Sequence, residues 1–455
     1  VEFLSETDTE VVAQLLDKYY TGDFFAAVRS AVAQLEGSYA LGVLCADFPE
    51  ELIAVRNASP LIVGLSDEGN FIASDIPAVL AHTRRILQLA DHEMVRLTKD
   101  SAQVFDAHGM PVNKMETIVN WDVSSAEKGG YAHFMIKEIM EQPQALSATI
   151  SPRIDADGSI VLDGVHLTKK DLQQINRVYM VACGSAYHTC MVGKYIMEKL
   201  ARIPVEADLA SEFRYRDPIV DEHTLVIIVS QSGETADTLA ALREAKRRGA
   251  RVLSIVNVVG STIASESDDV LYTWAGPEIS VATTKAYSTQ LTILYLLAFY
   301  FAHKLGHIDD RDLRRLLSAL IRLPDMVAGI LRQAPDIQQL AQRYAYLDHA
   351  YFIGRNLDYA VALEASLKLK EVSYLHAEAY AAGELKHGTI SLIEPGTPVF
   401  AVATQPDLFE KTLGNIREVK SRGAYVAALV GEDCENAGEF SDVAIKVPST
   451  LPEYM

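Results

Sequence analysis

The sequence has little positive charge and no long hydrophobic run. Its 41 lysines and arginines stand against 61 aspartates and glutamates, which gives a formal net charge of −20. This excess of negative charge argues against nucleic acid or an anionic membrane surface as a partner. The longest apolar run, residues 291–303, is shorter than the ~20 residues that a membrane-spanning helix needs, so it predicts a buried helix.

Cysteine is scarce, and its spacing matches no metal site. The chain has four cysteines in 455 residues, which predicts reduced thiols and a cytoplasmic location. The sequence lacks a Walker A loop, a G-x-G-x-x-G turn and the His-Glu-x-x-His spacing, so we expect neither a cofactor nor a metal. The cysteines are Cys45, Cys183, Cys190 and Cys434.

The most informative stretch is residues 226–238, where an apolar run changes abruptly into polar residues. The β-branched run 226–229 predicts a strand buried on both faces, as in a parallel sheet. A helical pattern then continues to Gly249, so the polar residues form a turn at a helix N-terminus. These residues are Ser230, Gln231, Ser232 and Thr235.

Such a turn favours an anion, because free N–H groups and the helix dipole meet there. Without the Walker lysine, a small phosphorylated metabolite fits better than a mononucleotide. A well-capped strand, turn and helix without a ligand stays open as the alternative.

From about residue 145 onward, strands and helices alternate in a pattern that occurs twice, at an offset of about 173 residues. Two parallel sheets covered by helices on both faces are therefore expected, with ligands outside the carboxyl ends of the strands. Residues 1–122 differ, since short strands and two helical patterns predict a mainly antiparallel α+β domain. The predicted strands 177–184, 225–229 and 251–256 recur as 350–355, 398–402 and 425–430.

A second group of candidate residues lies on one predicted helix. Glu364, Lys368 and Glu371 are spaced i, i+4 and i+7, so they share a helix face. An exposed ladder of ion pairs is the ordinary interpretation. Here the flanking residues are small or apolar, so we expect a largely buried helix, where a carboxylate beside an ammonium can move protons. The following residues, 377–387, have loop character.

Two further segments carry weaker signals. Thr283 and Thr284 precede the long apolar helix and either donate to a second part of the ligand or only cap the helix. Cys183 follows a predicted strand, and we expect it to be a buried small side chain rather than a nucleophile.

These segments resemble one family closely, that of glutamine–fructose-6-phosphate aminotransferase (isomerising), the glucosamine-6-phosphate synthases. Residues 5–10, 58–61 and 73–75 resemble the end of its glutaminase domain. The segments that resemble its isomerase half are Ser-Gln-Ser-Gly-Glu-Thr at 230–235, Ala-Thr-Thr-Lys at 282–285, Leu-Lys-Leu-Lys-Glu at 367–371 and His-Ala-Glu-Ala-Tyr-Ala-Ala-Gly-Glu-Leu-Lys-His-Gly at 376–388.

The resemblance implies an α/β protein with two repeated, doubly wound parallel-sheet sugar-isomerase (SIS) domains after part of an α+β class II glutaminase domain of the N-terminal nucleophile type. We expect a fragment, because the family's cysteine nucleophile would precede Val1 and its tail lysine would follow Met455. The implied parts are the glutaminase portion 1–122, a linker and connector helix 123–144, the first SIS domain 145–307 and a truncated second one 308–455.

The implied reaction transfers the amide nitrogen of L-glutamine to fructose 6-phosphate and isomerises the product to glucosamine 6-phosphate, the first step of hexosamine and UDP-N-acetylglucosamine synthesis. By this resemblance Glu371 moves a proton between C1 and C2, with Lys368 beside it. His387 acts in ring opening at the site of a neighbouring subunit of a homodimer, and Asp8 binds the amino group of glutamine. The implied substrate-binding residues are Ser230, Gln231, Ser232, Thr235, Ser185, Val281 and Thr283.

Local departures from the family pattern leave alternatives open. Ala186 stands where a serine is usual, which removes one hydroxyl donor, whereas Thr283 replaces a serine and keeps the hydroxyl; Thr389 replaces a proline. As given, the chain should bind fructose 6-phosphate without hydrolysing glutamine. A sugar-phosphate isomerase or deglycase, or a non-catalytic sugar-phosphate sensor on the same paired domains, are the competing hypotheses.

Overall fold

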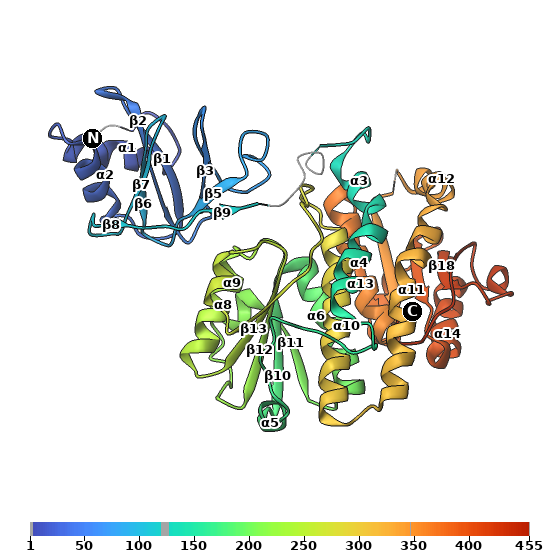
Figure 1. The fold of residues 1–455 in the computed structure, drawn as a ribbon. Helices are drawn as coiled ribbons and strands as arrows, with labels where there is room; N and C mark the ends of the chain where they lie inside the picture. The colour runs from blue at the N-terminus through green and yellow to red at the C-terminus, as the bar shows by residue number, and fades with distance from the viewer. Residues whose placement is uncertain (1–2, 120–126, 346, 455) are drawn as a thin grey trace. The chain divides into compact units, whose positions relative to one another are not determined.

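The computed structural model describes residues 3–119, 127–345 and 347–454 (Figure 1). The chain divides into two compact units, Val1–Gly129 and Gly130–Met455. The division lies within the predicted linker. The predicted boundary after residue 122 lies outside the described residues, and the boundaries inside the second unit stay predictions.

The first unit combines two helices, α1 (Glu10–Tyr19) and α2 (Phe24–Val32), with two sheets whose strands all pair antiparallel. The sheet orders are β1-β2-β6-β7-β8 and β4-β3-β5-β9. The prediction of a mainly antiparallel α+β domain is confirmed. The strands are β1 (Tyr39–Cys45), β2 (Phe48–Asn57), β3 (Ile62–Ser66), β4 (Gly69–Ala73), β5 (Arg85–Gln88), β6 (Met94–Leu97), β7 (Ala102–Phe105), β8 (Pro111–Val112) and β9 (Thr117–Ile118).

The second unit contains a parallel sheet in the order β11-β10-β12-β13-β14. Its central strand is β12, and every residue of β12 is buried. Val226 and Ile228 face one helical layer, whereas Ile227 and Val229 face the other, which explains the unbroken β-branched run. The strands are β10 (Arg177–Ala182), β11 (Val205–Leu209), β12 (Thr224–Ser230), β13 (Arg251–Val256) and β14 (Asp269–Tyr272).

A second parallel sheet repeats this topology in the order β16-β15-β17-β18-β19. The predicted duplication is therefore confirmed, strand for strand. One prediction is wrong: residues 376–381 form strand β16 rather than a loop, and β16 takes the place that β11 has in the first sheet. The strands are β15 (His349–Gly354), β16 (His376–Ala381), β17 (Pro398–Ala403), β18 (Tyr425–Gly431) and β19 (Val443–Val447).

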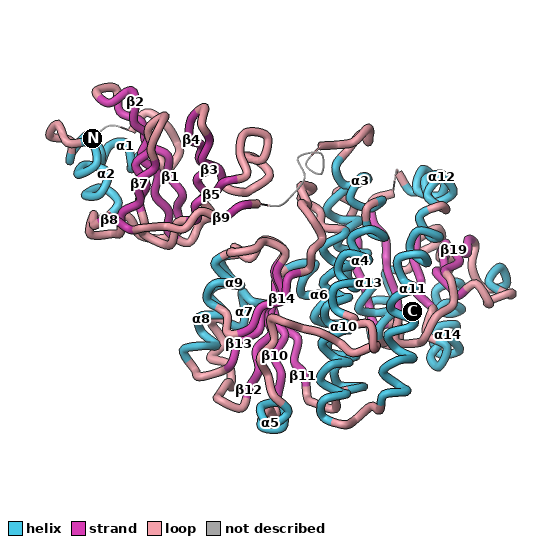
Figure 2. Tube along the Cα trace, in the orientation of Figure 1, coloured by secondary structure: helices cyan, strands magenta, loops and turns pink. Residues whose placement is uncertain are grey.

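Helices cover both faces of each sheet, and α10 (Lys285–Leu305) lies at the centre of the unit (Figures 1 and 2). The largest core packs α10 with α6 (Gly184–Leu200), α11 (Asp310–Leu331) and the start of α13 (Leu357–Ser373). The apolar run 291–303 is thus a buried helix, as predicted. In the described part of the chain, no helix is long and apolar enough to cross a membrane.

The remaining helices of the second unit complete these layers. On the first sheet, α7 and α8 cover the face opposite α6 and α10. On the second sheet, α13 and α14 cover opposite faces. The remaining α-helices of the second unit are α3 (Phe134–Met140), α4 (Gln142–Ile150), α5 (Lys169–Gln174), α7 (Ala210–Phe213), α8 (Ala236–Arg247), α9 (Thr262–Glu266), α12 (Ala334–Tyr344) and α14 (Phe409–Ser421).

Candidate functional site

The polar turn, residues 230–235, joins the carboxyl end of β12 to α8 and is folded by its own hydroxyls. The Ser230 hydroxyl accepts a hydrogen bond of 3.1 Å from the Gly233 backbone N–H. The Ser232 hydroxyl accepts one of 3.2 Å from the Glu234 N–H. Gly233 has a φ of +69°, and a Cβ added there would lie 2.0 Å from the Ser261 hydroxyl oxygen. Only glycine fits this turn.

The N-terminus of α8 is the electropositive end of this site. Thr235 is the N-cap residue, but its side chain makes no capping hydrogen bond with α8. Its hydroxyl lies 3.3 Å from that of Ser230 instead. The helix dipole and the N–H groups of the first turn therefore remain directed at whatever lies in front of the turn.

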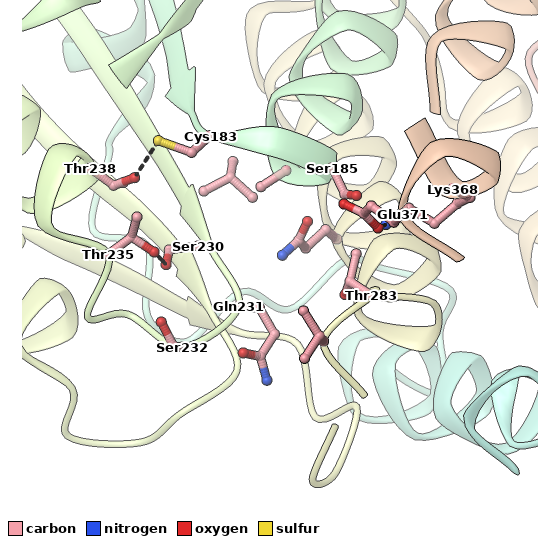
Figure 3. Close-up of a pocket in the computed structure, with 14 residues that line it drawn as sticks. Cys183, Ser185, Ser230, Gln231, Ser232, Thr235, Thr238, Thr283, Lys368 and Glu371 are labelled. Atoms are coloured by element: carbon pink, nitrogen blue, oxygen red, sulfur yellow. Dashed lines mark hydrogen bonds and ion pairs between the residues drawn. The ribbon is translucent and has the colours of Figure 1, made fainter. Parts of the chain in front are cut away.

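A cavity of about 220 Å³ lies in front of the polar turn (Figure 3). Because one water occupies ~30 Å³, the cavity has room for a small metabolite. Its only charged lining residues among those described are Lys368 and Glu371, which come from α13 of the second repeat. The lining residues are Cys183, Ser185, Ala186, Val229, Ser230, Gln231, Ser232, Thr235, Thr238, Val281, Thr283, Gln290, Lys368 and Glu371.

Three charged residues of α13 form one network, as their spacing predicts. The Lys368 ammonium lies 2.5 Å from Glu371 Oε2 and 3.5 Å from Glu364 Oε1. The Glu364 side chain is 8% exposed and that of Lys368 19%, whereas that of Glu371 is 35% exposed. Glu371 therefore faces the cavity with one carboxylate oxygen in contact with a cation.

Glu364 connects α13 to α6 of the first repeat. Its carboxylate accepts a hydrogen bond of 2.7 Å from the Ser185 hydroxyl and lies 2.7 Å from His188 Nδ1. Ser185 thus lines the cavity (Figure 3). Its hydroxyl donates to Glu364. His188 has no sequence motif around it, and only the approach of the two helices reveals its partner.

The loop of residues 277–284, which we name the wall loop, supplies Val281 and Thr283 to the cavity. Thr284 is the N-cap residue of α10, which was one of the two alternatives, but its own side chain does not cap the helix. The Glu278 carboxylate accepts from the N–H of Thr284 at 2.8 Å and from the Thr283 hydroxyl. Glu278 thereby caps the helix from inside the wall loop.

Comparison with known proteins identifies the two repeats. The family model described as SIS domain matches residues 171–300 and 345–452. A glutamine–fructose-6-phosphate aminotransferase (isomerizing) of Caldanaerobacter subterraneus subsp. tengcongensis is 55% identical over 451 residues, covering 99% of this chain and 74% of that protein. The chain belongs to the glutamine–fructose-6-phosphate aminotransferase (isomerizing) family.

The chain is also similar to other known proteins. A protein of that name from Thermus thermophilus is 46% identical over 450 residues, covering 99% of this chain and 74% of that protein. The solved C-terminal domain of glucosamine-fructose-6-phosphate aminotransferase from Francisella tularensis is 38% identical with a TM-score of 0.69, covering 72% of this chain and 92% of that one. Glucosamine-6-phosphate deaminase from Thermotoga maritima is 27% identical with a TM-score of 0.53, covering 66% of this chain and 85% of that one.

Two residues expected for the aminotransferase reaction are not among the residues that line the cavity. His387 is exposed at the end of a short 3₁₀ helix and does not line the cavity. Asp8 is exposed just before α1 in the first unit. Their roles stay predictions. Among the described residues, no group of three or more His, Cys, Asp or Glu side chains is placed to hold a metal ion.

The expectation that Cys183 is buried is wrong, because the structure places its partly exposed side chain in the cavity lining; that it is not a nucleophile stays a prediction. Cys183 follows the last residue of β10, at the sheet edge where the polar turn also lies, and its sulfur accepts a hydrogen bond of 3.5 Å from Thr238. Gln290, a buried polar residue of α10, also lines the cavity. A polar side chain just before the apolar run was its only signal in the sequence.

In the second repeat, the turn after the central strand β17 is bound by a side chain of the same repeat, that of Asp358. Asp358 and Ser185 are each the second residue of the helix that follows the first strand of their repeat. Asp358 is 1% exposed, and its carboxylate accepts from the Thr404 N–H at 3.0 Å, the Thr404 hydroxyl at 2.6 Å and the Gln405 N–H at 3.3 Å. Burial raises the pKa of Asp358. The donors after β17 are thus already bonded.

We predict that Gly233→Ala weakens the binding of a sugar phosphate, because the polar turn must open to admit the new Cβ. The dissociation constant for fructose 6-phosphate, measured by calorimetry, should rise roughly tenfold or more, which is about 1.4 kcal/mol. Gly414→Ala in α14, where no atom lies within 4 Å of an added Cβ, is the control. Unchanged affinity in Gly233→Ala would contradict the account of the turn.

Asp358→Ala should lower the free energy of unfolding by about 3 kcal/mol or more, since each buried donor left without a partner costs ~1–3 kcal/mol. Urea denaturation measures this loss. Asp157→Ala is the control, because the Asp157 carboxylate accepts the Ser159 N–H at 2.9 Å in an exposed turn and should cost well under half as much. Equal losses in the two variants would show that Thr404 and Gln405 do not depend on Asp358.

Proposed function

We propose that this chain acts in the transfer of nitrogen from glutamine to fructose 6-phosphate and in the isomerisation to glucosamine 6-phosphate, in line with the names of the aminotransferases above, and that the cavity is its sugar site. The observation that carries this proposal is that the polar turn of one repeat and Glu371 of the other line the same cavity. The isomerisation of a phosphorylated sugar needs a binding site for the phosphate and an acid–base group at a fixed distance from it.

The phosphate end of the sugar belongs on the polar turn. The turn offers N–H groups, three hydroxyls and the N-terminus of α8. The ammonium of Lys368 is engaged with Glu371 and Glu364 and belongs to the sugar end. Amides and hydroxyls therefore bind the phosphate inside a chain whose net charge is −20.

The sugar end lies against Glu371. Isomerisation of a ketose derivative moves a proton from C1 to C2, and one carboxylate can remove it and return it on the same face. The Lys368 ammonium contacts the Glu371 carboxylate directly, and Glu364 contacts Lys368 from the other side. Ser185, Val281 and Thr283 would then surround the sugar carbons.

The remaining parts of the proposal concern the first unit and the assembly. Its antiparallel α+β architecture fits the end of a class II glutaminase domain of the N-terminal nucleophile type, in which Asp8 would bind the amino group of glutamine. His387 would act in ring opening at the site of the partner in a homodimer. A cytoplasmic location, like these, is an expectation from the sequence.

The competing hypothesis of a sugar-phosphate isomerase or deglycase has less support. The deaminase from Thermotoga maritima shares the paired-sheet fold at 27% identity, over 66% of this chain. The aminotransferase of Caldanaerobacter is 55% identical over 99% of the chain, and this match includes the first unit. A non-catalytic sensor would not need a carboxylate and an ammonium in contact inside the site.

Glu371→Gln tests the proposal. In the whole enzyme this change should lower the rate of isomerisation by ~10² or more, because the amide cannot accept a proton. Calorimetry should find the affinity for fructose 6-phosphate within a few-fold of the unchanged protein. Lys370→Gln, an exposed residue of the same helix that does not line the cavity, is the control and should keep the rate. Full turnover by Glu371→Gln would exclude Glu371 as the acid–base group.

A further inference from the structure

A buried carboxylate reaches the wall loop from the connector helix. Glu138 lies on α3 and is 2% exposed. Its Oε1 atom accepts hydrogen bonds from the backbone N–H of Ile279 at 2.6 Å and of Ser280 at 3.1 Å. These two residues directly precede Val281, which lines the cavity.

Burying this carboxylate is costly, which is why its two contacts are informative. Burial raises the pKa of Glu138, while the two N–H donors oppose that rise. Its other oxygen, Oε2, is buried and has no hydrogen-bond partner among the described residues. A carboxylate whose burial is so unfavourable is expected where its oxygen holds another group in place. For Glu138 that group is the backbone of the wall loop.

The wall loop is held from two sides by carboxylates. Glu138 accepts from the middle of the loop. Glu278, which belongs to the loop, accepts from the Thr284 N–H at the loop's end at 2.8 Å and from the Ala286 N–H of α10 at 3.1 Å. Val281 lies between these two anchors and is fully exposed in the chain. An exposed apolar side chain that lines the cavity is free to cover a ligand, and the anchors on either side hold the backbone that carries it.

The connector helix, α3, also contacts Lys285, the residue that follows the wall loop. Lys285, the first residue of α10, is 3% exposed, and its ammonium lies 2.8 Å from Glu141 Oε2. Glu141 is the C-cap residue of α3. The C-terminal turn of α3 thus contacts the wall loop at residues 279–280 and the start of α10 together.

We propose that Glu138 is a positioning residue for the sugar site: through the Ile279 and Ser280 N–H groups it fixes the wall loop so that Val281 and Thr283 face the bound sugar. The connector helix thereby sets the affinity for the sugar part of the ligand, while the polar turn independently sets the affinity for phosphate. This inference rests on the proposed function for the identity of the ligand.

The test compares two ligands in the full chain. In Glu138→Ala the dissociation constant for fructose 6-phosphate should rise about tenfold or more, whereas that for inorganic phosphate should stay within about twofold, since phosphate contacts the polar turn alone. Glu138→Gln keeps an acceptor oxygen for the two N–H groups, so it should recover most of the affinity and provides the measurement if Glu138→Ala does not fold.

Asp442→Ala is the matched control. The Asp442 carboxylate also accepts a backbone N–H, that of Val426 at 2.7 Å, but it belongs to the second repeat and does not line the cavity. It should leave both affinities unchanged.

Three outcomes would overturn the proposal. Unchanged affinity for fructose 6-phosphate in Glu138→Ala would refute the positioning role alone. A parallel loss for phosphate and sugar phosphate would mean that Glu138 only supports the fold. If the unchanged chain bound no fructose 6-phosphate, the proposed function itself would fail, and this inference with it.

Discussion

The carboxylate of Glu364 holds the two repeats together at the place where the cavity forms. It accepts from the Ser185 hydroxyl and contacts His188 on α6, and it contacts Lys368 on its own helix. A buried carboxylate needs such partners, because an unpaired charge there would cost several kcal/mol. The contacts with Ser185 and His188 join α13 to α6, and Glu371, about two turns further along α13, lines the cavity.

The two repeats share a topology but divide the chemistry. The first repeat leaves the turn after its central strand open and lined with hydroxyls. The second repeat closes the same turn with Asp358, so its donors are bonded internally. What the second repeat contributes instead is a helix face with a carboxylate and an ammonium. The anion-binding turn and the acid–base group of one cavity therefore come from different copies of the same fold.

Much of this arrangement could be predicted from the sequence. The run 226–229 indicated the central strand and the polar turn, because an unbroken β-branched run is typical of a strand buried on both faces. The offset of about 173 residues predicted the duplication. Glu364, Lys368 and Glu371 were predicted to share a helix face, and they do. Helical spacing is a local property, so the sequence determines it directly.

The remainder depends on contacts between distant segments. Strand β16 was mistaken for a loop because its residues are small and polar, although the offset from β11 would have placed a strand there. The prediction that Cys183 is buried failed because the periodicity of a strand does not indicate which of its ends borders a cavity. His188 and Glu138 carry no motif, and their carboxylate and backbone partners lie more than a hundred residues away.

A crystal structure of the chain with fructose 6-phosphate tests the central claim most directly. The account predicts phosphate oxygens within hydrogen-bonding distance of the polar turn, and C1 and C2 of the sugar beside the Glu371 carboxylate. Phosphate bound elsewhere, or sugar carbons out of reach of Glu371 with the phosphate on the turn, would contradict it.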